Sequence, residues 1–291
     1  MRIGVVFPQT ELGGDRGALR AYAEGVEGLG FAHILVYDHV VGADRSVHTG
    51  WDGPYDLQTT FHEPFVMFGY LAAVTTLELV TGIIILPQRQ TALVAKQAAE
   101  VDLLTEGRFR LGVGLGWNAV EYEALDKDFT NRGRRMEEQV GLLRALWTQQ
   151  SVTHTGRYER VIGAGLAPLP IQQPIPVWFG GQSERAYRRI GRLADGWFPQ
   201  VQPGQRLDDA LALVADGARE AGRDPSSIQM DGRISWRGDA AKLVDHARSW
   251  DGVHATHLSV NTMGAGLGGV DGHLGALADG AAALAAAGLL G

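Results

Sequence analysis

Short runs of β-branched and aromatic residues alternate with longer segments of helical period along the whole chain. Each run is apolar at nearly every position, which is typical of strands in a parallel sheet that is covered on both faces. In the segments between them, apolar positions recur three and four residues apart, as on one face of a helix. The predicted strands are residues 3–7, 33–37, 79–86, 108–115, 175–180, 195–199, 228–235 and 256–261.

The two patterns alternate eight times, and this repetition predicts the fold. Eight units favour an α/β fold of the TIM type, a closed (β/α)8 barrel, over an open doubly wound sheet. A single barrel commonly fills a chain of 291 residues. No linker of disordered composition divides the sequence, so we expect one domain over residues 1–291.

Two stretches are longer than the connections of a barrel need to be. Residues 42–61 lie between the second strand and its helix, hence on the C-terminal face, where such barrels place active sites. They contain Arg45, Trp51 and Tyr55 and predict a substrate lid, with an ordinary surface loop as the alternative. Residues 150–174 follow a helix and start from the opposite face, which indicates a structural role unless the segment folds back along the barrel.

Composition limits the class of protein. The formal net charge is -7, whereas a nucleic-acid-binding protein needs a basic face. The absence of Cys excludes disulfides, thiolate nucleophiles and thiolate metal sites. The apolar run at the start is too short for a signal peptide, and residues 281–290 are too few to span a bilayer. These features predict a soluble cytoplasmic protein that binds neither nucleic acid nor membrane.

Several well-known catalytic motifs are missing. The sequence has no phosphate-binding loop of the G-x-x-x-x-G-K-[ST] type, no H-E-x-x-H pair and no G-x-S-x-G nucleophile elbow. The scattered His and Asp residues show no metal-ligand spacing, so we expect no metal.

Two titratable residues follow the second predicted strand. Adjacent strand residues point to opposite faces, so Asp38 and His39 cannot both point into one core. We expect His39 to face the barrel mouth and Asp38 to act through its backbone or by fixing the local turn. An imidazole titrates near neutral pH and can therefore donate or accept a proton during a reaction. The alternative is a His that only caps the strand end through hydrogen bonds.

Glycine-rich motifs end the fourth and fifth predicted strands. Gly114 and Gly116 allow a ligand to approach the backbone closely, although tight barrel packing explains them equally well. Gly180 and Gly181 precede Ser183 at the start of a predicted helix. Free backbone N–H groups at the positive end of a helix form an anion site that suits a phosphate. The alternative is a glycine turn with Ser183 as the helix N-cap.

Over essentially its whole length the sequence resembles the bacterial luciferase-like superfamily, and within it the oxidoreductases that use the deazaflavin coenzyme F-420. The resemblance rests on the segments "YDHVV", "LVTGIIILPQRQTALVAKQAAEVDLLTEGRFRLGVGLGWNAVEYEAL", "RGRRMEEQVGLLRALW" and "PIPVWFGGQSERAYRRIGRLADGWFP". It implies a (β/α)8 barrel with the flavin or deazaflavin ring across its C-terminal mouth.

The resemblance also implies roles for individual residues. The backbone at Thr81, Gly82 and Ile83 would form a bulge behind the ring, with a cis peptide between Gly82 and Ile83. His39 would lie near the reactive part of the ring as the catalytic residue, with Asp38 on the cofactor side. The other expected cofactor contacts are Leu115, Gly116 and Trp117 at the ring and Gly180, Gly181, Gln182 and Ser183 at the phosphate. Arg45, Trp51 and Tyr55 are the expected substrate contacts.

The leading hypothesis is an oxidoreductase that transfers hydride between coenzyme F-420 and a small organic substrate. The first alternative is a luciferase-like monooxygenase that uses flavin mononucleotide. Monooxygenases of this type often carry an Arg for the phosphate just after strand four, where this chain has Leu115, so we favour the deazaflavin. The second alternative is a non-catalytic protein that binds a flavin or deazaflavin, against which the Asp38–His39 pair argues. A homodimer is the expected assembly.

Overall fold

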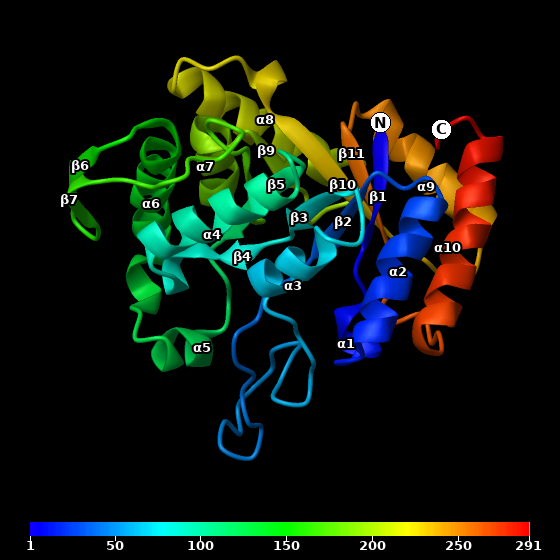
Figure 1. Cartoon of the computed structure of the whole chain (residues 1–291). Coiled ribbons are helices and arrows are strands. Elements are labelled where there is room, and N and C mark those ends of the chain that lie inside the picture. The colour runs from blue at the N-terminus through cyan, green and yellow to red at the C-terminus, as the bar shows by residue number, and fades with distance from the viewer. Residues whose placement is uncertain (291) are drawn as a thin grey trace.

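Eight parallel strands close into a barrel in the computed structural model, which describes residues 1–290 (Figure 1). β1 pairs with β2 on one side and with β11 on the other, and β3 and β4 both pair with β5, so the barrel has no free edge. The predicted (β/α)8 barrel is confirmed. Its strands are β1 (Arg2–Val6), β2 (His33–Val36), β3 (Glu78–Thr81) continued by β4 (Ile84–Ile85), β5 (Phe109–Gly114), β8 (Val177–Gly180), β9 (Gly196–Phe198), β10 (Gln229–Ser235) and β11 (His257–Asn261).

Helices surround the barrel, one after each strand position (Figure 1). The barrel helices are α2 (Arg16–Gly28), α3 (Pro64–Leu71), α4 (Thr91–Leu104), α6 (Arg132–Thr148), α7 (Glu184–Leu193), α8 (Gln205–Glu220), α9 (Ala240–Gly252) and α10 (Gly269–Ala286). The connecting segments hold the short helices α1 (Gln9–Leu12) and α5 (Ala119–Ala124) and the 3-10 turns η1 (Leu86–Gln88), η2 (Phe129–Asn131) and η3 (Pro225–Ser227).

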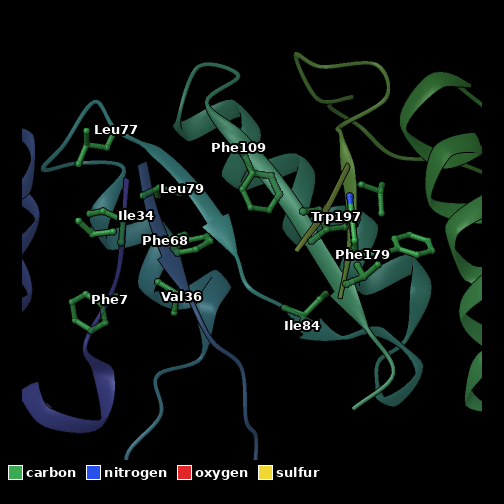
Figure 2. Close-up of a cluster of buried hydrophobic side chains, with 14 of the residues drawn as sticks. Phe7, Ile34, Val36, Phe68, Leu77, Leu79, Ile84, Phe109, Phe179 and Trp197 are labelled. Atoms are coloured by element: carbon green, nitrogen blue, oxygen red, sulfur yellow. The ribbon is translucent and has the colours of Figure 1, made fainter. Parts of the chain in front are cut away.

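The apolar strand residues alternate between two buried clusters. Ile34 and Val36 of β2 point outward and pack with Phe68 of α3 in the layer between barrel and helices (Figure 2). Leu35, between them, points inward and packs with Trp178 inside the barrel. Burying each such side chain contributes about 1.5–3 kcal/mol. Because both faces of each strand are buried, the strands are apolar throughout and not only at every second position.

The third predicted strand, residues 79–86, is wrong as a continuous element. β3 ends at Thr81, a cis peptide joins Gly82 to Ile83 as the resemblance implied, and β4 begins at Ile84. The hydroxyl of Thr81 donates to the carbonyl of Gly112 at 2.8 Å and accepts from the N–H of Gly112 at 2.7 Å, in place of ladder partners. A Cβ on Gly82 would lie 2.1 Å from Leu35 Cδ2, so only glycine fits this break.

The two long insertions differ in shape and position. Residues 42–61 contain no helix or strand and extend as a blue loop from the side of the molecule where the strands end (Figure 1). Residues 150–174 form the antiparallel hairpin of β6 (Val152–Thr155) and β7 (Arg160–Ala164), followed by an irregular segment. The carboxylate of Glu138 on α6 accepts hydrogen bonds from the backbone N–H groups of residues 157–159 and fixes the hairpin turn.

Candidate functional site

A cavity of about 530 Å³ opens at the C-terminal end of the barrel. Most of the residues predicted from sequence line its wall. They are Asp38, His39, Tyr55, Gly82, Ile83, Leu115, Gly116, Trp117, Gly180, Gly181, Gln182 and Ser183. The insertion of residues 42–61 contributes Tyr55 to the wall, whereas residues 150–174 contribute nothing to it. The position of residues 150–174 is therefore consistent with the structural role that the sequence indicates for them.

Three predicted site residues lie outside the cavity wall. Thr81 is buried in the barrel, where its hydroxyl bonds to Gly112. The guanidinium of Arg45 is bound by the carboxylate of Asp56 within the same loop, so it does not reach the cavity. Trp51 does not line the cavity but packs on Trp117, which does, with 5.4 Å between the ring centroids.

His39 lies beyond the end of β2 in an aromatic cluster made of His39, Tyr55, Phe61 and Trp117. The ring centroids lie 5.2 Å from His39 for Tyr55, 4.7 Å for Phe61 and 5.5 Å for Trp117, all in edge-to-face geometry. These contacts hold the imidazole at the cavity wall and leave its side chain only 12% exposed. A titratable ring that is both held in place and shielded from solvent is suited to directed proton transfer.

Sequence reasoning missed Glu121 on α5, whose carboxylate is fully buried behind His39. Its Oε2 lies 3.5 Å from His39 Nδ1 and accepts a hydrogen bond from Gln88 Nε2 at 3.1 Å. Its Oε1 accepts from the backbone N–H groups of Val40 and Val41. Burial raises the pKa of Glu121, but the bonds from His39, Val40 and Gln88 outweigh burial and lower the pKa below its usual value.

The ionised carboxylate of Glu121 therefore fixes both the backbone after β2 and the imidazole orientation. A carboxylate beside Nδ1 favours the tautomer that carries its proton there, which leaves Nε2 free to accept a proton. In the sequence, Glu121 is simply a Glu near the start of the segment that follows the fourth strand. Its partner His39 is distant in the chain, so the sequence does not show that the two residues meet.

Asp38 is buried beside His39 but points into the loop between β4 and α4. Its Oδ1 accepts from Arg89 Nη2 at 2.8 Å, and its Oδ2 accepts from the backbone N–H of Ile85 at 3.2 Å. Burial raises the pKa of Asp38, although Arg89 acts in the opposite direction. The carboxylate thus fixes the segment that follows the break in strand three. The expected role of Asp38, through its backbone or by fixing the local turn, stays a prediction.

The glycine-rich strand ends leave room for a ligand. Gly116 has φ +65°, a conformation that favours glycine. A Cβ on Gly180 would only reach ordinary contact with Ile83, at 3.4 Å, and would extend into the cavity wall. Gly181 has φ +155°, and a Cβ there would lie 2.7 Å from the Cβ of Ala186. The backbone conformation therefore favours glycine at Gly116 and Gly181, whereas the space at Gly180 would accept a Cβ.

The start of α7 has the properties of an anion site. Ser183 caps the helix by accepting from the N–H of Ala186 at 3.2 Å, as its N-cap interpretation predicts. The backbone N–H groups of residues 182–185 find no acceptor within residues 1–290. Gln182 and Ser183 line the cavity, so free donors at the positive end of this helix are placed to fit a phosphate there.

Two arginines that sequence reasoning missed line the cavity beside this helix start. Arg189 projects from α7 and donates to Glu137 Oε1 at 2.7 Å. Arg132 begins α6, and its buried Nε has no hydrogen-bond partner within residues 1–290. A Cβ on Gly133 would lie 2.9 Å from Arg189 Nη2 and 3.9 Å from Leu115 Cδ1, so Arg189 and Leu115, which both line the cavity, lie near Gly133. The basic run at residues 132–135 was the available sequence signal.

The floor of the cavity is charged. Asp231 of β10 accepts from Arg110 Nη2 at 3.2 Å and from the hydroxyl of Ser259 at 3.0 Å. Arg110 also forms an ion pair with Glu78, with 2.9 Å between its Nε and Glu78 Oε1, so it is shared between two buried carboxylates. Burial raises the pKa of Asp231 to about 6 even with Arg110 beside it.

Two features are absent from residues 1–290. No cluster of three His, Cys, Asp or Glu side chains is arranged to hold a metal ion. No helix in this part of the chain is long and apolar enough to cross a bilayer.

Comparison with known proteins gives the family. The model of the luciferase-like monooxygenase family matches residues 1–279, and the chain belongs to this family. An uncharacterised protein of Mycobacterium tuberculosis is 37% identical over 187 residues, which are 64% of each chain. The F-420-dependent glucose-6-phosphate dehydrogenase of Nocardia farcinica is 32% identical over 167 residues, 55% of this chain and 49% of the relative. Both matches span less than two thirds of the relative's length.

Two solved structures share the fold over nearly the whole chain. A monooxygenase from Streptomyces bottropensis has a TM-score of 0.78 at 18% identity and 99% coverage of both chains. An F-420-dependent secondary alcohol dehydrogenase in complex with an F-420–acetone adduct has a TM-score of 0.77 at 18% identity, covering 97% of this chain and 98% of that one. At this identity the likeness shows the fold alone, and the fold serves both kinds of enzyme.

Proposed function

We propose that this protein is a coenzyme F-420-dependent oxidoreductase that transfers hydride between the deazaflavin and a small organic substrate. The observation that carries the proposal is one cavity that joins a phosphate-type anion site at α7 to a shielded imidazole at His39. Relatives named as F-420-dependent dehydrogenases support the choice of cofactor.

The residues present fit a phosphorylated deazaflavin. The free N–H groups of residues 182–185, with Arg132 and Arg189, would hold its phosphate. Gly82 and Ile83 at the break in strand three would lie behind the ring, and Leu115 and Gly116 would line its edge. Once bound, the deazaflavin would supply hydride chemistry with little reactivity toward oxygen.

The chain itself contributes proton transfer and exclusion of water. When hydride adds to a carbonyl carbon, the oxygen needs a proton, and in the reverse direction the alcohol must lose one. His39 is the imidazole in the aromatic wall that would supply or accept this proton, and Glu121 holds its ring in position. General acid–base catalysis of this kind typically contributes about 10²- to 10⁴-fold in rate.

The flavin mononucleotide monooxygenase is the second candidate, and one observation favours it. Leu115 does not by itself disfavour a flavin phosphate, because Arg189 brings a guanidinium to the same cavity from α7. The phosphate site alone therefore does not distinguish the two cofactors. Our preference for the deazaflavin rests on the relatives.

Side-by-side titrations with oxidised F-420 and flavin mononucleotide, followed by fluorescence, test the assignment. We expect micromolar or tighter binding of F-420 and weaker binding of the flavin. Oxidation of reduced F-420 is then measured against a panel of aldehydes, ketones and enones. Tighter flavin binding with NADH-driven oxygen uptake would reverse the cofactor assignment. F-420 binding without turnover of any acceptor would support the non-catalytic alternative.

A further inference from the structure

Arg233 is a cavity-lining cation with no role in the assignments above. It lies two residues after Asp231 on β10, so both side chains point to the same face of the strand and into the barrel mouth. The phosphate site already has two arginines, Arg132 and Arg189, at another part of the wall. Arg233 is therefore available for a different ligand group.

Neutral groups hold the guanidinium of Arg233 in place. Its Nη1 donates to the hydroxyl of Tyr37 at 2.9 Å, and its Nη2 donates to Gln200 Oε1 at 3.2 Å. The nearby carboxylate of Asp231 is instead engaged by Arg110 and Ser259. A guanidinium has five N–H donors, and two are used here, so Arg233 is held with donors unfilled and its charge uncompensated.

Arg233 lies toward the aromatic cluster. Burial raises the pKa of Tyr55, and the positive charge of Arg233 is close enough to act in the opposite direction. The ring of Tyr55 contacts that of His39 at 5.2 Å. The cation, the aromatic wall and the imidazole therefore face one region of the cavity.

We propose that Arg233 binds the carboxylate of the substrate, which is then an organic acid whose apolar part lies against Tyr55 and Trp117. This inference rests on the proposed function, because it assigns the substrate class of the same site. A rigidly held guanidinium with free donors binds a carboxylate through charge-assisted hydrogen bonds, which are stronger than neutral ones. The aromatic wall matches a flat apolar body on the same molecule.

Matched probes of equal shape and different charge test the proposal. Cinnamate and cinnamamide are titrated by calorimetry into the wild-type protein, with and without saturating F-420. We expect cinnamate to bind at least tenfold more tightly than cinnamamide. In Arg233→Gln this preference disappears. Arg233→Lys keeps the positive charge and therefore retains part of the preference for cinnamate. Arg237→Gln, an exposed arginine just beyond β10, leaves the preference unchanged.

The dissociation constant of F-420 for each variant separates this proposal from the cofactor assignment. We expect Arg233→Gln to change it by less than threefold. A large loss of F-420 affinity with an intact cinnamate preference would place Arg233 in the cofactor site and overturn the proposal. Equal binding of the two probes by the wild type, or binding of neither, would also overturn it. If F-420 does not bind at all, the titrations of cinnamate and cinnamamide without cofactor still test whether Arg233 binds a carboxylate.

Discussion

The imidazole Nδ1 of His39 lies 3.5 Å from Oε2 of Glu121, a buried carboxylate that also receives the backbone N–H groups of Val40 and Val41. One side chain of α5 thus controls both the path of the chain after β2 and the orientation of the proposed proton donor. This arrangement makes Glu121 a positioning residue, because its carboxylate contacts His39 and not the cavity.

Replacing Glu121 by Gln should reduce turnover about tenfold or more while leaving F-420 affinity within about threefold. The amide keeps an acceptor for the backbone N–H groups but loses the negative charge beside the imidazole, so the ring is less firmly oriented. Steady-state oxidation of reduced F-420 with the best acceptor measures the effect. Glu123→Gln, on the exposed side of the same helix, is the matched control. Equal losses in the two variants would contradict the positioning role.

His39→Asn keeps hydrogen-bonding capacity but removes the titratable proton. We expect F-420 binding to stay within about threefold of wild type and turnover to fall by at least about a hundredfold. Fluorescence titration and steady-state kinetics on the same preparations give the two values. Normal turnover with normal binding would return His39 to the role of a strand-end cap.

Arg189→Gln should weaken F-420 binding about tenfold or more, because a charge-assisted hydrogen bond to the phosphate contributes about 1.5–3 kcal/mol. Arg192→Gln is the matched control, since Arg192 lies on the same helix and shares the partner Glu137 but does not line the cavity. Titrations at low and high salt should show a smaller salt dependence only for the Arg189 variant. A substitution at Gly181 would test the phosphate site less cleanly, because a side chain there would collide with Ala186.

Asp231 predicts a pH dependence of stability. Its folded pKa of about 6 lies above the unfolded value near 3.8, so the folded state binds more protons between these pH values. The contribution of Asp231 to the free energy of unfolding therefore falls as pH rises from about 4 to about 6, by up to about 3 kcal/mol.

Comparing wild type with Asp231→Asn isolates this contribution from that of the other carboxylates. Denaturant unfolding of both proteins at pH 7 and at pH 4.5 gives the difference in free energy. We expect the difference to shift in favour of the wild type at the lower pH. A difference that does not change with pH would show that Asp231 has an ordinary pKa.

Much of the fold could be predicted because burial of both strand faces leaves a continuous apolar pattern. The break in strand three could not be predicted from the apolar pattern, only from the family resemblance, since it depends on Leu35 of the neighbouring strand lying where a side chain at Gly82 would be. Nor could the β6–β7 hairpin, whose turn is held by Glu138 from the preceding helix. In each case the deciding contact joins residues far apart in sequence.

The site residues also fall into those that the sequence predicts and those that it does not. Glycines at strand ends carry a local signal, so the cavity wall at Gly116 and Gly180 could be predicted. Glu121 and Arg189 gave no such signal, because a Glu or an Arg on a helix is usually solvated. Arg45 showed the opposite error: it lies in the lid loop, but Asp56 in that same loop binds its guanidinium. Packing and ion pairing decide which charged side chains reach the cavity.

The contact between Trp51 and Trp117 gives the protein an optical reporter of its own. Their indole centroids lie 5.4 Å apart at an interplanar angle of 44°, with Trp51 on the loop of residues 42–61 and Trp117 in the segment between β5 and α5. Two indoles this close and tilted couple their electronic transitions, and the coupling depends steeply on their separation. Displacement of the loop would therefore change the near-ultraviolet circular dichroism. Opening of the site can then be followed without a label and before any substrate is known.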